Sequence, residues 1–202
     1  MALGRVGEYQ IIYADPPWFY RDRKCGSSKF GLGSVGTYGC LETERICKIP
    51  VGDWVASNSV LLLWTTWPHL LSAREVIEAW GFTYVTLGFL WVKTNKNSGT
   101  PFFGPGFYSK SNSEPCLLAK RGSGVRPVTN SISQIVEVPG EMVVAPARVG
   151  KHSEKPAAVR NRIVELFGDV PRLEMFAREQ TPGWDAWGNE IDPLDALEVP
   201  DV

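Results

Sequence analysis

Residues Tyr9 to Trp18 read YQIIYADPPW. The six residues from Tyr9 to Ala14 are mostly apolar, branched or aromatic, which predicts a buried β-strand. The strand should end at the prolines, because proline lacks a backbone N–H and restricts the residue before it. Asp15 is therefore expected just past the carboxyl end of a buried strand, where open α/β sheets bind their ligands.

Apolar strands and an amphipathic helix follow in the next part of the chain. Residues 59–66 (SVLLLWTT) predict a second buried strand, and Pro68 opens a helical pattern that ends at Gly81. Residues 82–94 predict another strand, bent at Gly88. Strand, helix and strand in this order are typical of a parallel α/β sheet.

The second half of the chain repeats this pattern between long loops. A helix is predicted over residues 156–167, with Gly168 as its stop. Further strands are predicted over residues 115–121, 141–145 and 172–177. Long loops are predicted over residues 19–38, 95–112 and 146–155. Loops of this length in a small domain tend to be functional, so we expect them over the carboxyl ends of the strands.

Length and charge indicate one domain with a basic body. The 202 residues, 44% of them hydrophobic, suffice for a single core. We expect residues 1–191 to form this domain and residues 192–202 to form an acidic, flexible tail. The net charge is −1, but the last thirteen residues hold five acids and no base, so the rest of the chain is net basic. A basic body is compatible with a polyanionic partner.

The cysteines and the apolar runs exclude several classes of protein. The four cysteines form no Cys-x-x-Cys pair, and with only two histidines no zinc site of standard spacing can be written, so we expect no metal. We interpret the cysteines as reduced thiols of a cytoplasmic protein. No apolar run is long enough to span a bilayer, so we expect no membrane partner.

The tetrapeptide Asp15-Pro16-Pro17-Trp18 carries the predicted chemistry. The Asp15 carboxylate and the Pro16 carbonyl, held outward by the fixed φ of proline, are two acceptors for the N–H bonds of an exocyclic nucleobase amine. Such acceptors draw the nitrogen lone pair back out of the ring, which is preorganised electrostatic catalysis. Trp18 would offer a flat face for stacking the base. The simpler alternative is a rigid turn with Trp18 packed in the core.

Several motifs in one order resemble a known family. Downstream of the tetrapeptide they are LWT at 63–65, LWVKTN at 90–95, SEPCL at 113–117, SEKP at 153–156, LEMFAR at 173–178 and WGNE at 187–190. Together they resemble the MT-A70 family of adenine-N6 methyltransferases from Tyr9 to about Ile191. The resemblance implies an α/β, single-domain, Rossmann-like class I fold that uses S-adenosylmethionine (SAM). It also implies a permuted motif order, with the catalytic strand before the SAM-binding strand.

The resemblance further implies a set of site residues. Lys155, at a helix start, would offer a cation and free N–H groups to the methionine carboxylate of SAM. The expected cofactor-binding residues are Asp15, Lys155, Glu174, Phe176, Arg178, Gln180, Asn189 and Glu190. Phe176 stands where other SAM enzymes have a glycine-rich turn. The expected catalytic residues are Asp15, Pro16, Pro17, Trp18, Tyr38 and Glu114. Tyr38 resembles a gate of the methyl-transfer pocket and Glu114 an acid behind the target base, although a loop tyrosine and a surface glutamate are the alternatives.

Clusters of cations around these motifs are candidates for nucleic-acid contact. The loop residues expected to bind phosphate are Arg21, Arg23, Lys24, Lys29, Arg148, Lys151 and His152. Further cationic candidates are Lys110, Lys120, Arg121 and Arg126.

The implied activity is N6-methylation of adenine in nucleic acid, with DNA favoured over RNA because the compact chain resembles bacterial and phage members. Cytosine-N4 methylation is an alternative, but those enzymes usually carry Ser-Pro-Pro-Tyr or a relative. A catalytically silent, nucleic-acid-binding partner subunit is another alternative, although such chains typically lose the tetrapeptide or the lysine that Lys155 represents. A homodimer and a methyltransferase-like partner subunit both stay open.

Overall fold

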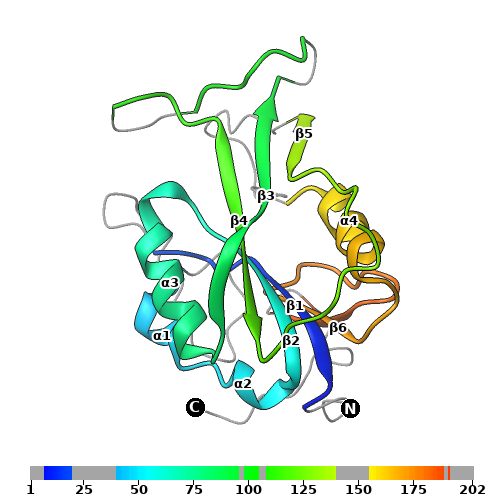
Figure 1. Cartoon of the computed structure of the whole chain (residues 1–202). Coiled ribbons are helices and arrows are strands. Elements are labelled where there is room, and N and C mark those ends of the chain that lie inside the picture. Colours follow the sequence, from blue (N-terminus) through cyan, green and yellow to red (C-terminus); the bar gives the residue numbers. More distant parts are fainter. Residues whose placement is uncertain are drawn as a thin grey trace.

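The computed structural model describes residues 7–19, 40–95, 98–104, 108–139, 155–188 and 191. In order its elements are β1 (Tyr9–Ala14), α1 (Thr43–Cys47), α2 (Val51–Trp54), β2 (Val55–Trp64), the 3₁₀ turn η1 (Trp67–His69), α3 (Leu70–Ala79), β3 (Thr83–Thr94), β4 (Ser113–Arg121), β5 (Ile135–Pro139), α4 (Ala157–Phe167), β6 (Arg172–Met175) and β7 (Asp185–Trp187). Helices stand between β1 and β2, between β2 and β3 and between β5 and β6, whereas β3, β4 and β5 are successive elements (Figure 1).

The strands form one mixed seven-stranded sheet in the order β5-β3-β4-β2-β1-β6-β7. β1 is parallel to both β2 and β6, and β7 is parallel to β6. β4 runs antiparallel between β2 and β3, whereas β5 is parallel to β3. β2 and β3 therefore point the same way, as the strand-helix-strand pattern predicts, but they do not pair. β4 occupies the place between them because it follows β3 along the chain and returns beside it as an antiparallel neighbour.

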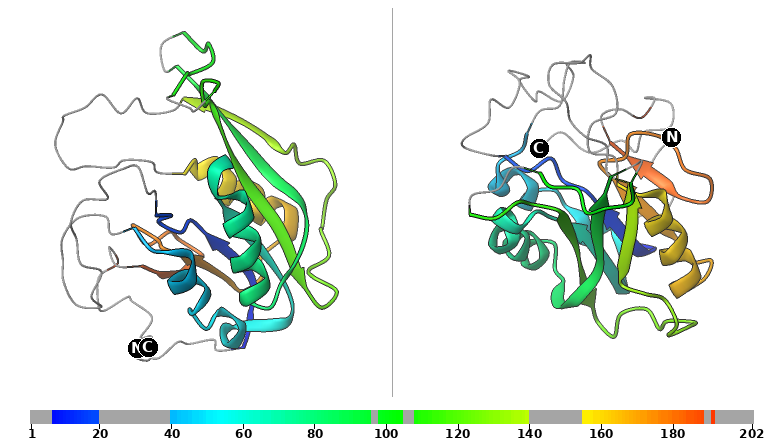
Figure 2. Two further views of the ribbon diagram at one scale, coloured as in Figure 1. Left: turned by 90° about the vertical axis from the view of Figure 1, so that its left-hand side faces the viewer. Right: turned by 90° about the horizontal axis from the view of Figure 1, so that it is seen from above.

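Helices cover both faces of the sheet. Figures 1 and 2 show α1 and α3 on one face and α4 on the other. Successive side chains of β1 enter opposite cores: Ile12 and Ala14 pack on the α3 side, and Ile11 and Tyr13 on the α4 side. Because β1 is buried on both faces, nearly all of its residues are apolar, and this apolar run predicted the strand from the sequence.

Several predicted elements are confirmed. β1 has the predicted bounds, and α4 ends at Gly168, whose φ of +78° suits glycine. β3 changes register between Leu87 and Phe89, around the predicted bend at Gly88. Gly88 has no room for a side chain, because a Cβ there would lie 2.9 Å from the Leu62 side chain.

Other elements were missed or lie outside the described residues. α1, α2, β5 and β7 are short and were not predicted. The second strand begins at Val55, four residues earlier than expected, and ends at Trp64. The strand predicted at 141–145, the acidic tail and most of the loops at 19–38 and 146–155 lie outside the described residues.

One cysteine departs from the expectation of reduced thiols. Cys40 is disulfide-bonded, whereas Cys47 and Cys116 are free, so the expectation is wrong for Cys40. Sequence spacing alone does not reveal which thiols come within bonding distance, and this is why the pairing was missed. Among the described residues there is no group of side chains that could hold a metal ion. Within the same residues no helix is both long and apolar enough to cross a membrane.

One edge of the sheet collects the ends of several elements. The carboxyl ends of the parallel strands β1, β2 and β6 lie at this edge. Because β4 is antiparallel, its amino end lies there too, and Cys116 pairs with Trp64 at the end of β2. We refer to this edge below as the catalytic edge, since Asp15 stands on it.

Gly188 fixes the turn beside β6. It follows β7 and lies against Ala177, whose N–H donates to the Trp187 carbonyl over 3.0 Å. A Cβ on residue 188 would lie 2.2 Å from the Ala177 carbonyl oxygen, so the two backbones would have to separate.

We expect Gly188→Ala to destabilise the protein by about 2 to 3 kcal/mol, because overpacking against backbone cannot be relieved by a rotamer change. The matched control is Gly52→Ala, because a Cβ on that α2 residue meets only ordinary contacts, the nearest at 3.6 Å. Urea denaturation of both variants measures the difference. Equal urea midpoints for the two variants would show that the turn at Gly188 accommodates a side chain without loss of stability.

Candidate functional site

A lysine held between two carboxylates forms the centre of the site. Lys155 Nζ lies 2.8 Å from Asp15 Oδ2 and 3.4 Å from Glu114 Oε2. Asp15 follows β1, Glu114 is the second residue of β4, and Lys155 stands just before α4. The antiparallel direction of β4 is what brings Glu114 to the catalytic edge. Three elements far apart in the sequence therefore meet in one charge cluster.

A second lysine completes this cluster. Lys93 of β3 donates a hydrogen bond to Glu114 and lies over the ring of Trp91, with Nζ 4.8 Å from the ring centroid. Lys155 lies over the ring of Trp64 at 5.6 Å. Lys93, Glu114, Lys155 and Asp15 thus form a row of alternating charge, which we call the charge row. The cations and carboxylates balance, as burial of charge requires.

The environment acts differently on the members of the charge row. Burial raises the pKa of Asp15 and outweighs the opposite effect of the Lys155 cation. Burial also acts to raise the pKa of Glu114, but Lys155 and Lys93 together hold that pKa below its usual range. The pKa of Lys155 is raised, because the two carboxylates outweigh the loss of solvation. Asp15 is therefore the carboxylate of the row that takes up a proton more readily.

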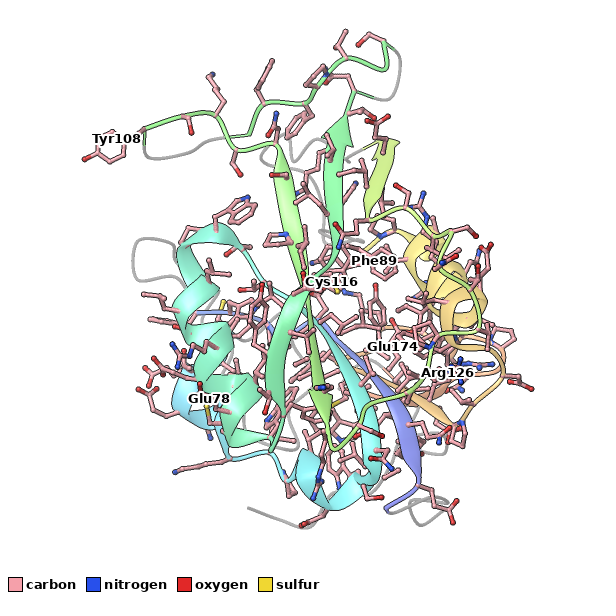
Figure 3. All side chains as sticks on the ribbon, viewed as in Figure 1. Glu78, Phe89, Tyr108, Cys116, Arg126 and Glu174 are labelled. Atoms are coloured by element: carbon pink, nitrogen blue, oxygen red, sulfur yellow. The ribbon has the colours of Figure 1, made fainter. Side chains whose placement is uncertain are left out.

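A second buried ion pair lies beside the charge row. Arg160 of α4 donates to Glu174 Oε1 over 2.8 Å, and its guanidinium also lies 3.7 Å from Glu179. Among the described residues, Glu174 Oε2 is buried without a hydrogen-bond partner, and burial raises the pKa of this carboxyl. Figure 3 shows Glu174 on the side of the sheet that α4 covers. A buried unpartnered carboxylate oxygen beside a cleft is suited to accept a hydrogen bond from a ligand.

Members of both charge groups line one cleft, Asp15 and Lys155 from the charge row and Arg160, Glu174 and Glu179 from the second group. The cleft is partly open to solvent, and its empty space, counted out to the open mouth, is about 400 Å³. The lining residues are Tyr13, Asp15, Lys155, Arg160, Glu174, Met175, Phe176, Arg178 and Glu179. The cleft lies at the carboxyl ends of β1 and β6, where doubly wound sheets bind ligands.

Phe176 forms a strained wall of this cleft. It directly follows β6 with a φ of +60°, and it is the one non-glycine residue with positive φ in the described part of the chain. Its ring meets the edge of Trp187 at 5.2 Å. A left-handed non-glycine residue costs about 1 to 2 kcal/mol and tends to occur at functional sites.

The structure brings five of the predicted cofactor residues to the cleft. Asp15, Lys155, Glu174, Phe176 and Arg178 all line it. Glu114 joins them through Lys155 and is not a surface glutamate, since its side chain is only 13% exposed.

Gln180 does not join the cleft. Its amide donates to the Trp184 carbonyl over 2.6 Å, so the side chain is held by its own loop. Tyr38, Asn189, Glu190, Arg21, Arg23, Lys24, Lys29, Arg148, Lys151 and His152 lie outside the described residues.

Trp18 differs from the expected base-stacking platform. It is only 6% exposed, its indole N–H donates to the Trp64 carbonyl over 3.1 Å, and its ring stacks on His69 at 5.7 Å. The prediction of an open face is wrong, and the alternative of a tryptophan packed in the core describes the structure. Trp18 instead anchors the chain after Asp15. Pro16 keeps a carbonyl that accepts from the Trp18 N–H over 2.9 Å, which leaves one lone pair for another donor.

Some cationic candidates lie away from the site. Lys120 and Arg121 end β4, so they lie at the edge of the sheet opposite the catalytic edge. Arg121 donates to the Gly52 carbonyl over 2.6 Å, which is a structural role. Sequence reasoning also missed Lys93, Arg160 and Glu179, although Arg160 interrupts the apolar stripe of α4 and could have drawn notice.

Comparison with known proteins gives one family and several relatives. The MT-A70 family model matches residues 9–190. The type II methyltransferase M.MunI of a Mycoplasma species is 32% identical, with 96% of this chain and 82% of that protein covered. Human N(6)-adenine-specific methyltransferase METTL4 is 27% identical over 91% of this chain but only 37% of its own length. The N6-methyladenosine RNA methyltransferase MTA1 of Cryphonectria parasitica is 28% identical, with 91% of this chain and 52% of that protein covered.

We expect Lys155→Met to destabilise the protein, because Asp15 and Glu114 would lose the cation between them. Removing one partner of a buried pair costs about 3 to 5 kcal/mol, and the partial exposure of Asp15 reduces this to about 2 to 3. Asp15 would then lose its cation and Glu114 would keep only Lys93, so the folded-state pKa of both carboxyls rises and the stability of the variant falls as pH rises through those values. The difference in the free energy of unfolding between the variant and the unsubstituted protein should therefore be larger at pH 8 than at pH 5.

Urea denaturation at both pH values measures this difference. The control is Arg74→Met, since Arg74 belongs to an exposed pair with Glu78 and should matter little. A loss of stability in Lys155→Met that is equal at both pH values would contradict the pairing of Lys155 with Asp15 and Glu114.

Proposed function

Because the chain belongs to the MT-A70 family, we propose that it is a SAM-dependent methyltransferase that methylates the N6 amine of adenine in nucleic acid. The observation that carries the proposal is the charge row at the catalytic edge, where Asp15 of the tetrapeptide meets Lys155 beside a cleft. A silent subunit is disfavoured, because the chain keeps both of these residues.

The fit of the cofactor rests on the chemistry of the cleft. SAM carries a carboxylate, ribose hydroxyls and an adenine ring. Lys155 and Arg178 supply cations for the carboxylate, and the free oxygen of Glu174 can accept from a hydroxyl. Phe176 offers an aromatic wall to the adenosine. When bound, the cofactor supplies an electrophilic methyl group.

The residues of the chain act on the nucleophile. The lone pair of an adenine amine is delocalised into its ring, so the amine attacks poorly. The Asp15 carboxylate and the free lone pair of the Pro16 carbonyl can accept its two N–H bonds and localise that pair on nitrogen. With the cofactor bound, the bond from N6 to the methyl carbon would form as the bond from that carbon to sulfur breaks, and positive charge would develop on N6. Asp15 would stabilise that charge as the nearest anion, and N6 would afterwards release a proton to solvent.

DNA is the favoured substrate. The relative matched over most of both chains is a type II methyltransferase, whereas a relative named for RNA is matched over about half of its own length. Incubation with labelled SAM and a panel of DNA and RNA oligonucleotides, followed by nucleoside mass spectrometry, identifies both the base and the sugar. N4-methylcytosine as the product, or no methylated nucleoside at all, would overturn the proposal.

Asp15→Asn tests the catalytic role of the carboxylate. The variant keeps the shape but replaces an anionic acceptor with an amide, so we expect turnover to fall on the order of 100-fold. SAM affinity should change much less. Asp53→Asn is the control, because Asp53 is exposed in α2, before the amino end of β2. Methyl transfer and SAM affinity are measured on the same preparation, and near-normal turnover in Asp15→Asn would remove Asp15 from the mechanism.

The pH dependence of turnover gives an independent check. Only the ionised Asp15 carboxylate can stabilise positive charge, and burial raises its pKa. We therefore expect turnover to fall on acidification at a pH above the ordinary aspartate value of about 3.9. The residual activity of Asp15→Asn should lack this acidic limb. An unchanged profile in that variant would assign the limb to another group.

A further inference from the structure

Trp67 is exposed, unlike the other tryptophans of this chain. All eight tryptophans lie within the described residues, and seven of them are buried or half-buried. Trp67 is 49% exposed. A large aromatic side chain open to water offers a flat face on which a partner can pack.

The position of Trp67 is close to the catalytic machinery. It begins η1, three residues after the carboxyl end of β2, and therefore stands on the catalytic edge. Its indole N–H donates to Ser113 Oγ over 3.1 Å, and Ser113 directly precedes Glu114 of the charge row. The indole thus has a defined orientation although it is exposed.

The turn that carries Trp67 is tied to the tetrapeptide. His69 Nε2–H donates to the Phe19 carbonyl over 2.9 Å, and His69 Nδ1 shares a hydrogen bond of 2.9 Å with Thr66 Oγ1. The same His69 ring stacks on Trp18. Trp67 is therefore held in a fixed relation to the residues that follow Asp15.

Trp67 and the cleft lie on different sides of the sheet edge. Successive residues of β4 point to opposite faces, so Ser113 faces the α3 side while Glu114 faces the α4 side with Lys155. With the target base held at Asp15 on the α4 side, Trp67 on the α3 side is placed to meet a different base, that of a neighbouring nucleotide on the same strand.

Other exposed groups at this edge have matching chemistry. Phe19 follows the tetrapeptide and is exposed, and Phe103 and Tyr108 are exposed in the segment between β3 and β4. Figure 3 shows Tyr108 far out on that segment, beyond the catalytic edge. Lys110 is exposed in the same segment. Aromatic faces together with cations are the combination that single-stranded nucleic acid binds.

We propose that Trp67 is a stacking platform for the base that neighbours the target adenine. This inference rests on the proposed function and extends it, because it names unpaired nucleic acid as the form that the site binds. An unpaired or flipped-out segment is also what a buried reaction site requires, since N6 of a paired adenine is not free to reach Asp15.

The test compares variants of Trp67 on a single-stranded DNA oligonucleotide with one adenine. Base stacking on an aromatic residue corresponds to about 5- to 150-fold in affinity. We expect Trp67→Ala to raise the KM for the oligonucleotide by such a factor, with kcat at saturation little changed. The KM of Trp67→Phe, which keeps a flat ring, should lie between the KM of Trp67→Ala and that of the unsubstituted protein. Tyr84→Ala is the matched control, because Tyr84 is 51% exposed near the start of β3, at the opposite edge.

Two measurements separate this inference from the proposed function. Binding of oligothymidylate, which has no target base, should weaken in Trp67→Ala without any methyl transfer, while SAM affinity measured by calorimetry stays unchanged. If Trp67→Ala does not fold, Trp67→Leu serves in its place, since it keeps apolar bulk without a ring face.

The inference is overturned if Trp67→Ala or Trp67→Leu keeps the KM and the oligothymidylate affinity of the unsubstituted protein. It is equally overturned if these variants change only the oligomeric state, which would make Trp67 a protein contact. Failure of the proposed function looks different, because the unsubstituted protein would then transfer no methyl group to any oligonucleotide.

Discussion

The ammonium group of Lys155 between Asp15 and Glu114 is the interaction on which the arrangement of the site depends. The three residues stand after β1, in β4 and before α4, so the cluster forms only when these elements are in register. An antiparallel β4 is a necessary part of this geometry. A parallel strand in the same place would present its amino end, and Glu114 with it, at the opposite edge of the sheet.

The tetrapeptide crosses the catalytic edge from one layer of the fold to the other. Asp15 faces the α4 side, where it meets Lys155, and Trp18 packs in the core on the α3 side. The two prolines between them restrict the backbone, so the position of the Trp18 ring constrains the position of the Asp15 carboxylate. A buried Trp18 therefore serves catalysis as an anchor, and its hydrogen bond to the Trp64 carbonyl ties it to the end of β2.

The sequence predicted what is local and strongly patterned. β1 and α4 were found because one is a compact apolar run before prolines and the other has proline and glycine at its ends. The place of β4 between β2 and β3 was not found, because pairing order depends on contacts distant in the sequence. β7, with three residues, is too short to show a period. Asp15 and Lys155 were predicted through motifs, whereas Lys93 and Arg160 show their roles only when partners from other elements surround them.

The turn after β6 has a left-handed backbone at Phe176, where glycine would be the usual residue. Glycine adopts this conformation without cost, yet a glycine there would leave Trp187 without its edge contact and the cleft without a wall. The small residue is needed instead across the turn. Gly188 lets the chain after β7 approach the Ala177 backbone, where no side chain fits. That close approach, with the hydrogen bond from Ala177 to Trp187, holds the strained residue in place. The glycine is therefore needed after β7 and not after β6, so the sequence around Phe176 carries no glycine-rich turn.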